Sequence, residues 1–311
     1  MDILSIILIV AGLILFETIT SVDNAIINAD VLSTMGKKAR KWFLLWGILI
    51  AVFLIRGALP WLLVWAINPG LGPMGALTAA LSSDPKVVEA IDNSSPMLLA
   101  GGGIFMVFIF FHWLFLEPKK FGLKGEPFFQ RQGVWFYAVV SIILSLVVWF
   151  ALQINPLMAF GAVVGSTAFF IVHGFKENAA KMEEKLLGQS NGQGVISTSD
   201  ASKIFYLEVL DGTFSIDGVV GAFAFTLSVP LILLGNGFGA IVVRQLTVAN
   251  IDRIKKYAFL KNGAMYSIFV LGMIMLLDSF GFHIPSWLSP LVTASIVGYF
   301  FLKSRKVLPE N

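Results

Sequence analysis

Cysteine is absent from the 311-residue sequence, which excludes disulfide bridges, thiolate metal sites and dithiol redox motifs. Charged residues are scarce too: they make up 13% of the chain, against 57% hydrophobic residues, and the mean hydropathy is +0.84. A soluble domain carries about 25% charged residues. The composition therefore predicts an all-α, polytopic membrane protein that is surrounded by the lipid bilayer.

Two further absences narrow the function. The sequence contains no P-loop or other nucleotide-binding motif, so we expect neither ATP-driven transport, nor an enzyme, nor a cofactor. The isoelectric point is about 9.0, but the Lys and Arg residues lie in loops between apolar segments. This distribution is typical of membrane topology signals, and we expect no nucleic-acid partner.

Nine segments are apolar enough to cross a membrane, which takes about 20 residues of helix. They are residues 3–32, 42–67, 97–116, 134–152, 156–174, 203–222, 223–247, 258–278 and 286–303. The first is expected to be a retained span, not a signal peptide. With the N-terminus outside and the C-terminus in the cytoplasm, every Lys and Arg except Arg56 and Lys86 falls on the cytoplasmic side. The positive-inside rule therefore predicts a multi-pass protein of the cell membrane.

Two long loops organise the chain. Residues 68–96 form an acidic external loop that is expected to include a short helix. Residues 176–202 form a cytoplasmic linker, in which a short amphipathic helix precedes a stretch rich in Gly, Ser and Gln. The linker divides the chain into an N-terminal half of five spans, residues 1–175, and a C-terminal half of four spans, residues 203–311.

Acidic clusters lie inside two of the apolar segments. The first comprises Glu17, Asp23 and Asn24, and the second comprises Glu208, Asp211, Ser215 and Asp217. A carboxylate at bilayer depth costs about 2.5–3.5 kcal/mol on insertion scales, so it needs partners, water or a cation. Five such carboxylates indicate a cation pathway. Buried contacts with Arg56 or with hydroxyl groups are the structural alternative.

The spacing of the clusters predicts an inverted repeat. They lie five spans apart, so their helices run antiparallel, and transporters commonly place the substrate site where inverted repeats meet near the midplane. Asp217 lies nine residues after Glu208, which is the opposite side of an unbroken helix. A shared site would therefore require local unwinding, which we expect between Gly212 and Gly218 and around Thr20.

The candidate ligands are mostly hard oxygen atoms. Carboxylates, the Asn24 amide and the Ser215 hydroxyl favour Mn²⁺, Ca²⁺ or Mg²⁺ as substrate. His112 and His173 lie near the ends of spans, where an interfacial or structural role is expected. Glu117 and Glu126 fall in loops and are expected to be solvated.

At these motifs the sequence resembles the TerC family, named for tellurium resistance, and in particular its branch described as an uncharacterised membrane domain. The resemblance is carried by FETITSVDNAI at 16–26, LEVLDGTFSIDGVVGAF at 207–223, GNGFG at 235–239 and LKNGAMYSIFVLG at 260–272. It implies membership of a LysE-like transporter superfamily and an association with manganese export. It also implies that the ion site includes Glu17, Asp23, Asn24, Glu208, Asp211 and Asp217.

The predicted function is that of a secondary transporter of divalent cations, with Mn²⁺ export favoured and exchange for protons compatible with the carboxylates. A non-transporting membrane partner in metal loading or stress response is the main alternative. An intramembrane aspartyl enzyme built on Asp23 and Asp217 is less favoured, because the other carboxylates supply more negative charge than an acid–base pair needs. The sequence leaves the oligomeric state open.

Overall fold

The computed structural model describes residues 3–21, 25–26, 28, 31–32, 35–47, 50, 57–78, 85–119, 122–188, 200–255 and 257–307. Within these ranges the fold is all-helical and contains no β-strand, which confirms the all-α part of the prediction. The long helices are α1 (Ile3–Thr20), α6 (Pro85–Leu116), α8 (Phe136–Leu152), α9 (Pro156–Gly188), α10 (Asp200–Ala222), α11 (Val229–Lys255), α12 (Leu260–Ser279) and α13 (Leu288–Arg305). The short ones are α3 (Lys37–Trp42), the π-helix Phe43–Gly47, α4 (Ala58–Ile67), the 3-10 turn Pro69–Leu71, α5 (Gly72–Thr78), α7 (Glu126–Arg131) and the 3-10 turn Gly133–Trp135.

Five helical segments are long and apolar enough to cross a membrane. They are Ile3–Thr20, Asn93–Leu116, Gly133–Leu152, Pro156–Asn178 and Leu260–Ser279, and two shorter apolar helical segments are Ala58–Ile67 and Val229–Val243. Many apolar side chains on the outer helices are exposed, for example Trp149 on α8 and Ile171 on α9. Lipid, not water, suits such a surface. The protein is therefore a helical membrane protein, while the count of nine spans stays a prediction.

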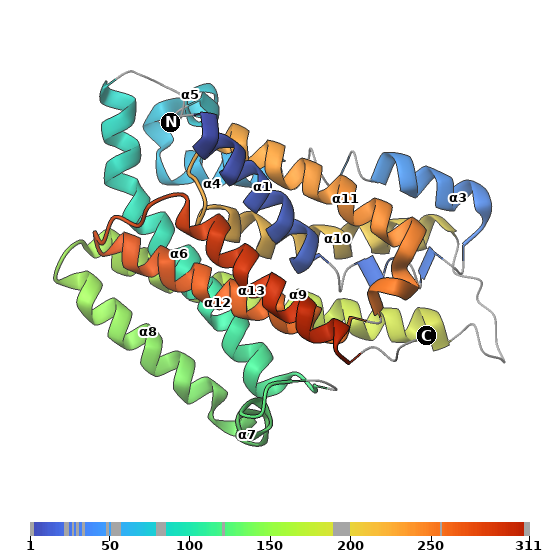
Figure 1. Cartoon of the computed structure of the whole chain (residues 1–311). Coiled ribbons are helices and arrows are strands. Elements are labelled where there is room, and N and C mark those ends of the chain that lie inside the picture. The colour runs from blue at the N-terminus through green and yellow to red at the C-terminus, as the bar shows by residue number, and fades with distance from the viewer. Residues whose placement is uncertain are drawn as a thin grey trace.

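Helix α6 lies at the centre of the bundle, between α9 and α12 (Figure 1). Three consecutive glycines let both neighbours approach closely. A Cβ atom at Gly101 would lie 2.7 Å from the carbonyl oxygen of Gly161 on α9, and one at Gly103 would lie 2.9 Å from the carbonyl oxygen of Gly272 on α12. These glycines therefore serve helix packing, since only residues without a side chain permit such close backbone contact.

Helices from the two predicted halves interleave. Helix α1 packs against α11 and α13, and α6 packs against α12 as extensively as against α9 (Figure 1). Glu17, near the end of α1, is therefore brought against helices of the C-terminal half. This arrangement creates the candidate site described below.

Helix boundaries correct three sequence-based expectations. Helix α6 begins at Pro85, not near 97, so the loop after α4 is shorter than residues 68–96 and holds α5. Helix α9 continues from the membrane segment to Gly188, so the amphipathic helix expected in the 176–202 linker extends the span directly. Helix α10 is unbroken from Asp200 to Ala222, so the unwinding expected between Gly212 and Gly218 is wrong. The division of residues 203–247 into two helices is confirmed, at 223–228.

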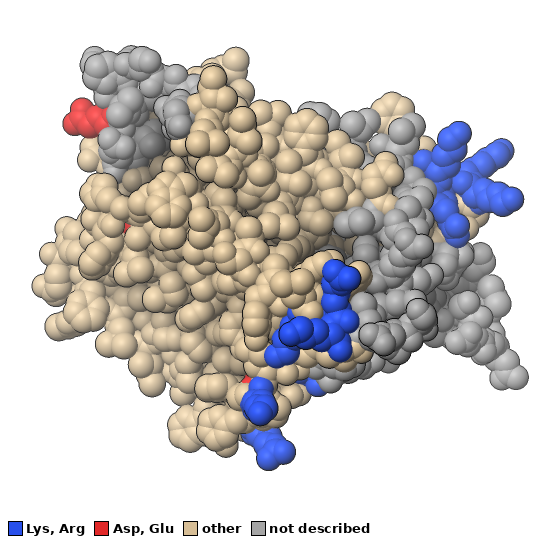
Figure 2. Space-filling view, viewed as in Figure 1, with Lys and Arg blue, Asp and Glu red and all other residues tan. Residues whose placement is uncertain are grey.

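Charge is distributed unevenly over the bundle. Figure 2 shows that the described Lys and Arg side chains gather at the end away from the N-terminus. They include Lys37 and Lys38 on α3, Lys261 at the start of α12, and Lys303 and Arg305 at the end of α13. These residues come from separate parts of the sequence, and the fold collects them at one end.

Candidate cation-binding site

Glu17 is completely buried where α1, α10 and α11 meet. Its Oε1 atom accepts a hydrogen bond of 2.8 Å from the hydroxyl group of Ser21. A Cβ atom at Gly239 of α11 would lie 2.6 Å from Glu17 Cβ, and a Cβ atom at Gly218 of α10 would overlap Glu17 Oε2. The two glycines therefore let α10 and α11 close around the carboxyl group. Gly218 lies within the continuous helix α10. A glycine is needed there because the backbone approaches Glu17 closely, not because of its backbone conformation.

Asp217 precedes Gly218 and therefore lies on the helix next to Glu17. Its Oδ2 atom forms an ion pair with Lys176 Nζ of α9, and the side chains are only 13% and 20% exposed. Its Oδ1 atom is buried and has no hydrogen-bond partner among the described residues. A carboxylate oxygen accepts up to two hydrogen bonds or ligates a cation. Asp217 therefore keeps unused binding capacity in a place shielded from water.

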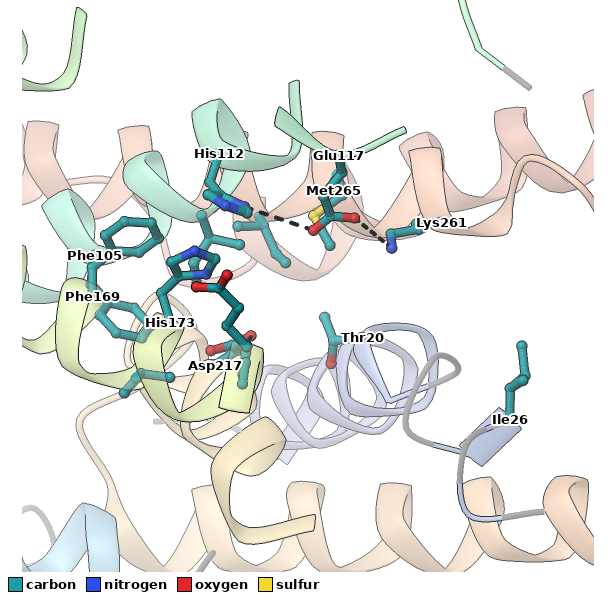
Figure 3. A pocket seen from close by; sticks show the side chains of 15 residues that line it. Thr20, Ile26, Phe105, His112, Glu117, Phe169, His173, Asp217, Lys261 and Met265 are labelled. Carbon is teal, nitrogen blue, oxygen red and sulfur yellow. Dashed lines mark hydrogen bonds and ion pairs between the residues drawn. The ribbon is translucent and has the colours of Figure 1, made fainter. Parts of the chain in front are cut away.

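A cavity of about 440 Å³ adjoins Asp217, at the end of the bundle where α6 ends and α12 begins. Figure 3 shows His112, His173 and Asp217 along one side and Thr20 across from Asp217. The polar or titratable lining residues are Thr20, His112, Glu117, His173, Lys176, Glu177, Asp217 and Lys261. The cavity thus connects a largely buried carboxylate with the basic end of the bundle.

The outer part of the cavity holds a row of titratable groups. The rings of His112 and His173 have centroids 4.0 Å apart, and His112 Nδ1 lies 3.8 Å from Glu117 Oε1. Glu117 Oε2 forms an ion pair of 2.7 Å with Lys261 Nζ, which Figure 3 marks. Burial acts to raise the pKa of the Glu117 carboxyl group, but the charge and the hydrogen bond of Lys261 outweigh burial and hold the pKa below its ordinary value. Glu117 is therefore an anion at neutral pH, held by a lysine.

The other predicted ligands are arranged differently. The Glu208 carboxyl group lies against Gly47 of the π-helix, and the buried Ser215 hydroxyl donates to the Asp211 carbonyl oxygen within α10. Because α10 is unbroken, Glu208 and Asp217 lie on opposite sides of it. Asp23 and Asn24 lie outside the described residues, as does Arg56. Among the residues that the structure describes, no three His, Asp or Glu side chains form a group suited to hold a metal ion. Glu17 and Asp217 are the two predicted carboxylates that share one level of the bundle.

Lys176 is the residue that sequence reasoning missed. We expected it in the cytoplasmic linker, whereas it is the counter-ion of Asp217. Its position in the sequence could have indicated this role, because Lys176 lies two residues beyond the predicted end of the 156–174 span. The aliphatic part of a lysine at a helix end can lie along apolar surface, so its ammonium group can reach a neighbouring helix. His112 and His173 also line the cavity, whereas the sequence predicted only an interfacial or structural role for them at the ends of spans.

Glu126 was expected in a solvated loop, and that expectation is wrong: the residue is 2% exposed. Its carboxyl oxygens accept hydrogen bonds of 3.0 and 3.1 Å from Asn262 Nδ2, and Oε1 accepts one of 3.1 Å from the Tyr266 hydroxyl. Burial of nearby Lys119 lowers the pKa of its ammonium group, while Glu126 acts in the opposite direction. The short helix α7 thus turns a polar residue inward onto α12, which no hydropathy pattern reveals.

A family model described as a protein of unknown function, DUF475, matches residues 22–307. The chain belongs to this family. The match begins after Glu17 and includes the whole second acidic segment and both histidines that line the cavity. No curated protein and no solved structure matches the chain. The DUF475 description names no function, so the function has to be inferred from the residues of the site. The resemblance to the TerC family stays a prediction.

Proposed function

We propose that this DUF475 protein is a secondary transporter of divalent cations, with Mn²⁺ export as the favoured activity. The observation that carries the proposal is the burial of Glu17, at 0% exposure, against Gly218, the neighbour of Asp217. Two carboxylates from opposite halves of the chain thus lie inside a membrane bundle. Such groups are costly at bilayer depth unless a cation, a proton or a counter-ion balances them.

The chemistry of the site favours a hard divalent cation. Glu17 and Asp217 provide carboxylate oxygens, and Ser21 provides a hydroxyl group beside Glu17. Asp23 and Asn24 are expected to complete the ligand set, as the resemblance to the TerC family implies. Oxygen ligands of this kind suit Mn²⁺, Ca²⁺ and Mg²⁺. The cavity that adjoins Asp217 offers the cation a route from the basic end of the bundle.

The direction of transport follows from the proposed topology. Nine spans place the basic end in the cytoplasm and the N-terminus outside, and the gathering of Lys and Arg in Figure 2 supports this orientation. A cytoplasmic cavity would load the cation for export. In this scheme the two halves are inverted repeats that meet at Glu17 and Asp217, although α10 needs no break for that meeting.

Cysteine labelling tests the topology. We expect an impermeant thiol reagent to label Asp84→Cys in intact cells and to label Gly36→Cys and Lys306→Cys only after the membrane is opened. The chain has no native cysteine, so each single variant reports on one position. Labelling of Gly36→Cys from outside would reverse the orientation and would make the cavity external.

Transport itself is tested in liposomes that contain a Mn²⁺-sensitive dye. We expect Asp23→Asn and Asp217→Asn each to reduce Mn²⁺ flux at least about 100-fold, because an Asn keeps the size of the side chain but removes its charge. Glu89→Gln is the matched control, since Glu89 is an exposed carboxylate on α6. Parent-like flux in both Asn variants would show that the carboxylates are structural.

The same assay separates the alternatives. A protein that loads metal into partners would bind Mn²⁺ in calorimetry but would not move it across the liposome membrane. An intramembrane aspartyl enzyme is less supported, because Asp217 is paired with Lys176 instead of being left as one of an acid–base pair.

A further inference from the structure

Lys176 lies in an unusual place for a lysine of a membrane protein. It belongs to the segment Pro156–Asn178 of α9, which is apolar enough to span the membrane, and its side chain is 20% exposed. Its ammonium group points back into the bundle to Asp217 of α10. A buried ammonium group is stable only with a partner of opposite charge. The ammonium group of Lys176 therefore occupies the position beside Asp217 that a free cation could take.

Asp217 is only partly neutralised by this pairing. Lys176 contacts Oδ2, while Oδ1 is buried without a hydrogen-bond partner among the described residues. A structural ion pair in a low-dielectric place is normally completed by hydrogen bonds to every oxygen atom. Asp217 itself lines the cavity of about 440 Å³. The Asp217 carboxylate can therefore accept a second cation while it is paired with Lys176.

An alternative place for the ammonium group exists in the same cavity. Glu117, which also pairs with Lys261, and Glu177 both line the cavity. The charge of Lys176 also acts to lower the pKa of the Glu117 carboxyl group. A lysine side chain has a flexible four-carbon stem and carries a compact charge. Lys176 can therefore leave Asp217 and stay balanced by carboxylates nearer to the basic end of the bundle.

We propose that the ammonium group of Lys176 is a tethered competitor for the cation position at Asp217, and that an arriving divalent cation displaces it toward Glu117 and Glu177. This inference rests on the proposed transport function. Lys176 is then a positioning residue: it keeps the site balanced in the unloaded protein and lowers its affinity, so that a bound cation can be released. Without it, the same carboxylate would hold a divalent cation more tightly.

The test measures MnCl₂ binding by calorimetry to the purified full chain, with CaCl₂ and MgCl₂ in parallel. We expect Lys176→Gln to bind at least about tenfold more tightly than the parent, because a unit positive charge has been removed from contact with the ligand. Lys176→Arg keeps the charge and should bind as weakly as the parent. The double variant with Lys176→Gln and Asp217→Asn should lose the gain. Lys303→Gln is the matched control, because it removes the same charge at the end of α13, outside the cavity lining.

The outcomes separate this inference from the proposed function. If the parent transports Mn²⁺ but Lys176→Gln binds it equally or more weakly while remaining monodisperse, Lys176 is a structural partner and the inference fails alone. If Lys176→Gln binds Mn²⁺ more tightly but neither the parent nor any variant shows flux, the competing role of Lys176 is supported and the proposed transport function is rejected. Tighter binding that survives in the double variant would place the cation elsewhere and would overturn the inference.

Discussion

Two buried carboxyl groups in this protein have opposite environments. Glu126, against the start of α12, has both oxygen atoms satisfied by Asn262 and Tyr266. Asp217, inside the bundle, has one oxygen paired with Lys176 and the other without a hydrogen-bond partner in the described part of the chain. A cavity borders Asp217, whereas Glu126 is not among the residues that line it.

The difference separates a structural acid from a candidate functional one. Burial alone does not distinguish them, because both residues are largely shielded from solvent. What distinguishes them is whether the surrounding groups use all the acceptor capacity of the carboxyl group. A satisfied network stabilises one conformation, whereas an under-satisfied acid beside a cavity can exchange partners.

The largest effects expected are opposite ones at these two residues: a loss of stability at Glu126 and a loss of Mn²⁺ binding at Asp217. We expect Glu126→Ala to lower the free energy of unfolding by about 2–4 kcal/mol, because it leaves the buried Asn262 and Tyr266 donors without acceptors. Mn²⁺ binding by the folded fraction should stay unchanged. Asp217→Asn should abolish binding with little loss of stability, because Lys176 can then pair with Glu117 and Glu177, which line the same cavity. Thermal unfolding in detergent and calorimetry on both variants measure the two effects, and a loss of Mn²⁺ binding in well-folded Glu126→Ala would end the distinction.

A second prediction concerns the glycine that contacts Glu17. We expect Gly218→Ala to lower the free energy of unfolding by about 1–3 kcal/mol, because the added methyl group overlaps the Glu17 carboxyl group and forces it to move. Mn²⁺ binding should weaken as well. Gly174→Ala is the matched control: nothing lies within 4 Å of its Cβ position, so it should be neutral or slightly stabilising. Equal effects of the two substitutions on the unfolding midpoint would show that the contact with Glu17 has no cost.

The smallest effect expected is the pH dependence of the Glu117–Lys261 pair. The folded-state pKa of Glu117 lies below its ordinary value near 4.5, since Lys261 outweighs burial. The pair therefore adds stability above that pH, and this stability is lost as the pH falls below 4.5 through the folded-state pKa. We expect Glu117→Gln to lower the unfolding midpoint at pH 7 by an amount equivalent to less than about 1 kcal/mol, given the partial exposure of the pair. The difference from the parent should shrink as the pH falls below 4.5, and a constant difference would assign the loss to packing.

Several elements could be predicted from the sequence because they depend on local composition. The segment expected at 134–152 corresponds to α8, Phe136–Leu152, and the segment expected at 258–278 corresponds to α12, Leu260–Ser279. Hydropathy failed at α6, whose first turns carry polar residues such as Glu89 and Asn93. A hydropathy window measures the apolar thickness that a helix can cross, and a helix can extend beyond that thickness.

The candidate site was predictable in part for the same reason. A carboxylate in an apolar segment is visible in the sequence, so Glu17 and Asp217 could be singled out. Their partners could not, because Lys176 and Gly239 lie far from them along the chain and meet them only through the packing of α9, α10, α11 and α1.

The sequence by itself determined that the protein is a helical membrane protein with acids inside its apolar segments, because composition and local periodicity decide both. Only the tertiary structure decided that Glu126 is satisfied and that Asp217 shares a cavity with a lysine of another helix. The physical reason is that the role of a buried charge depends on the groups within a few ångströms of it, and helix packing brings those groups from distant parts of the chain.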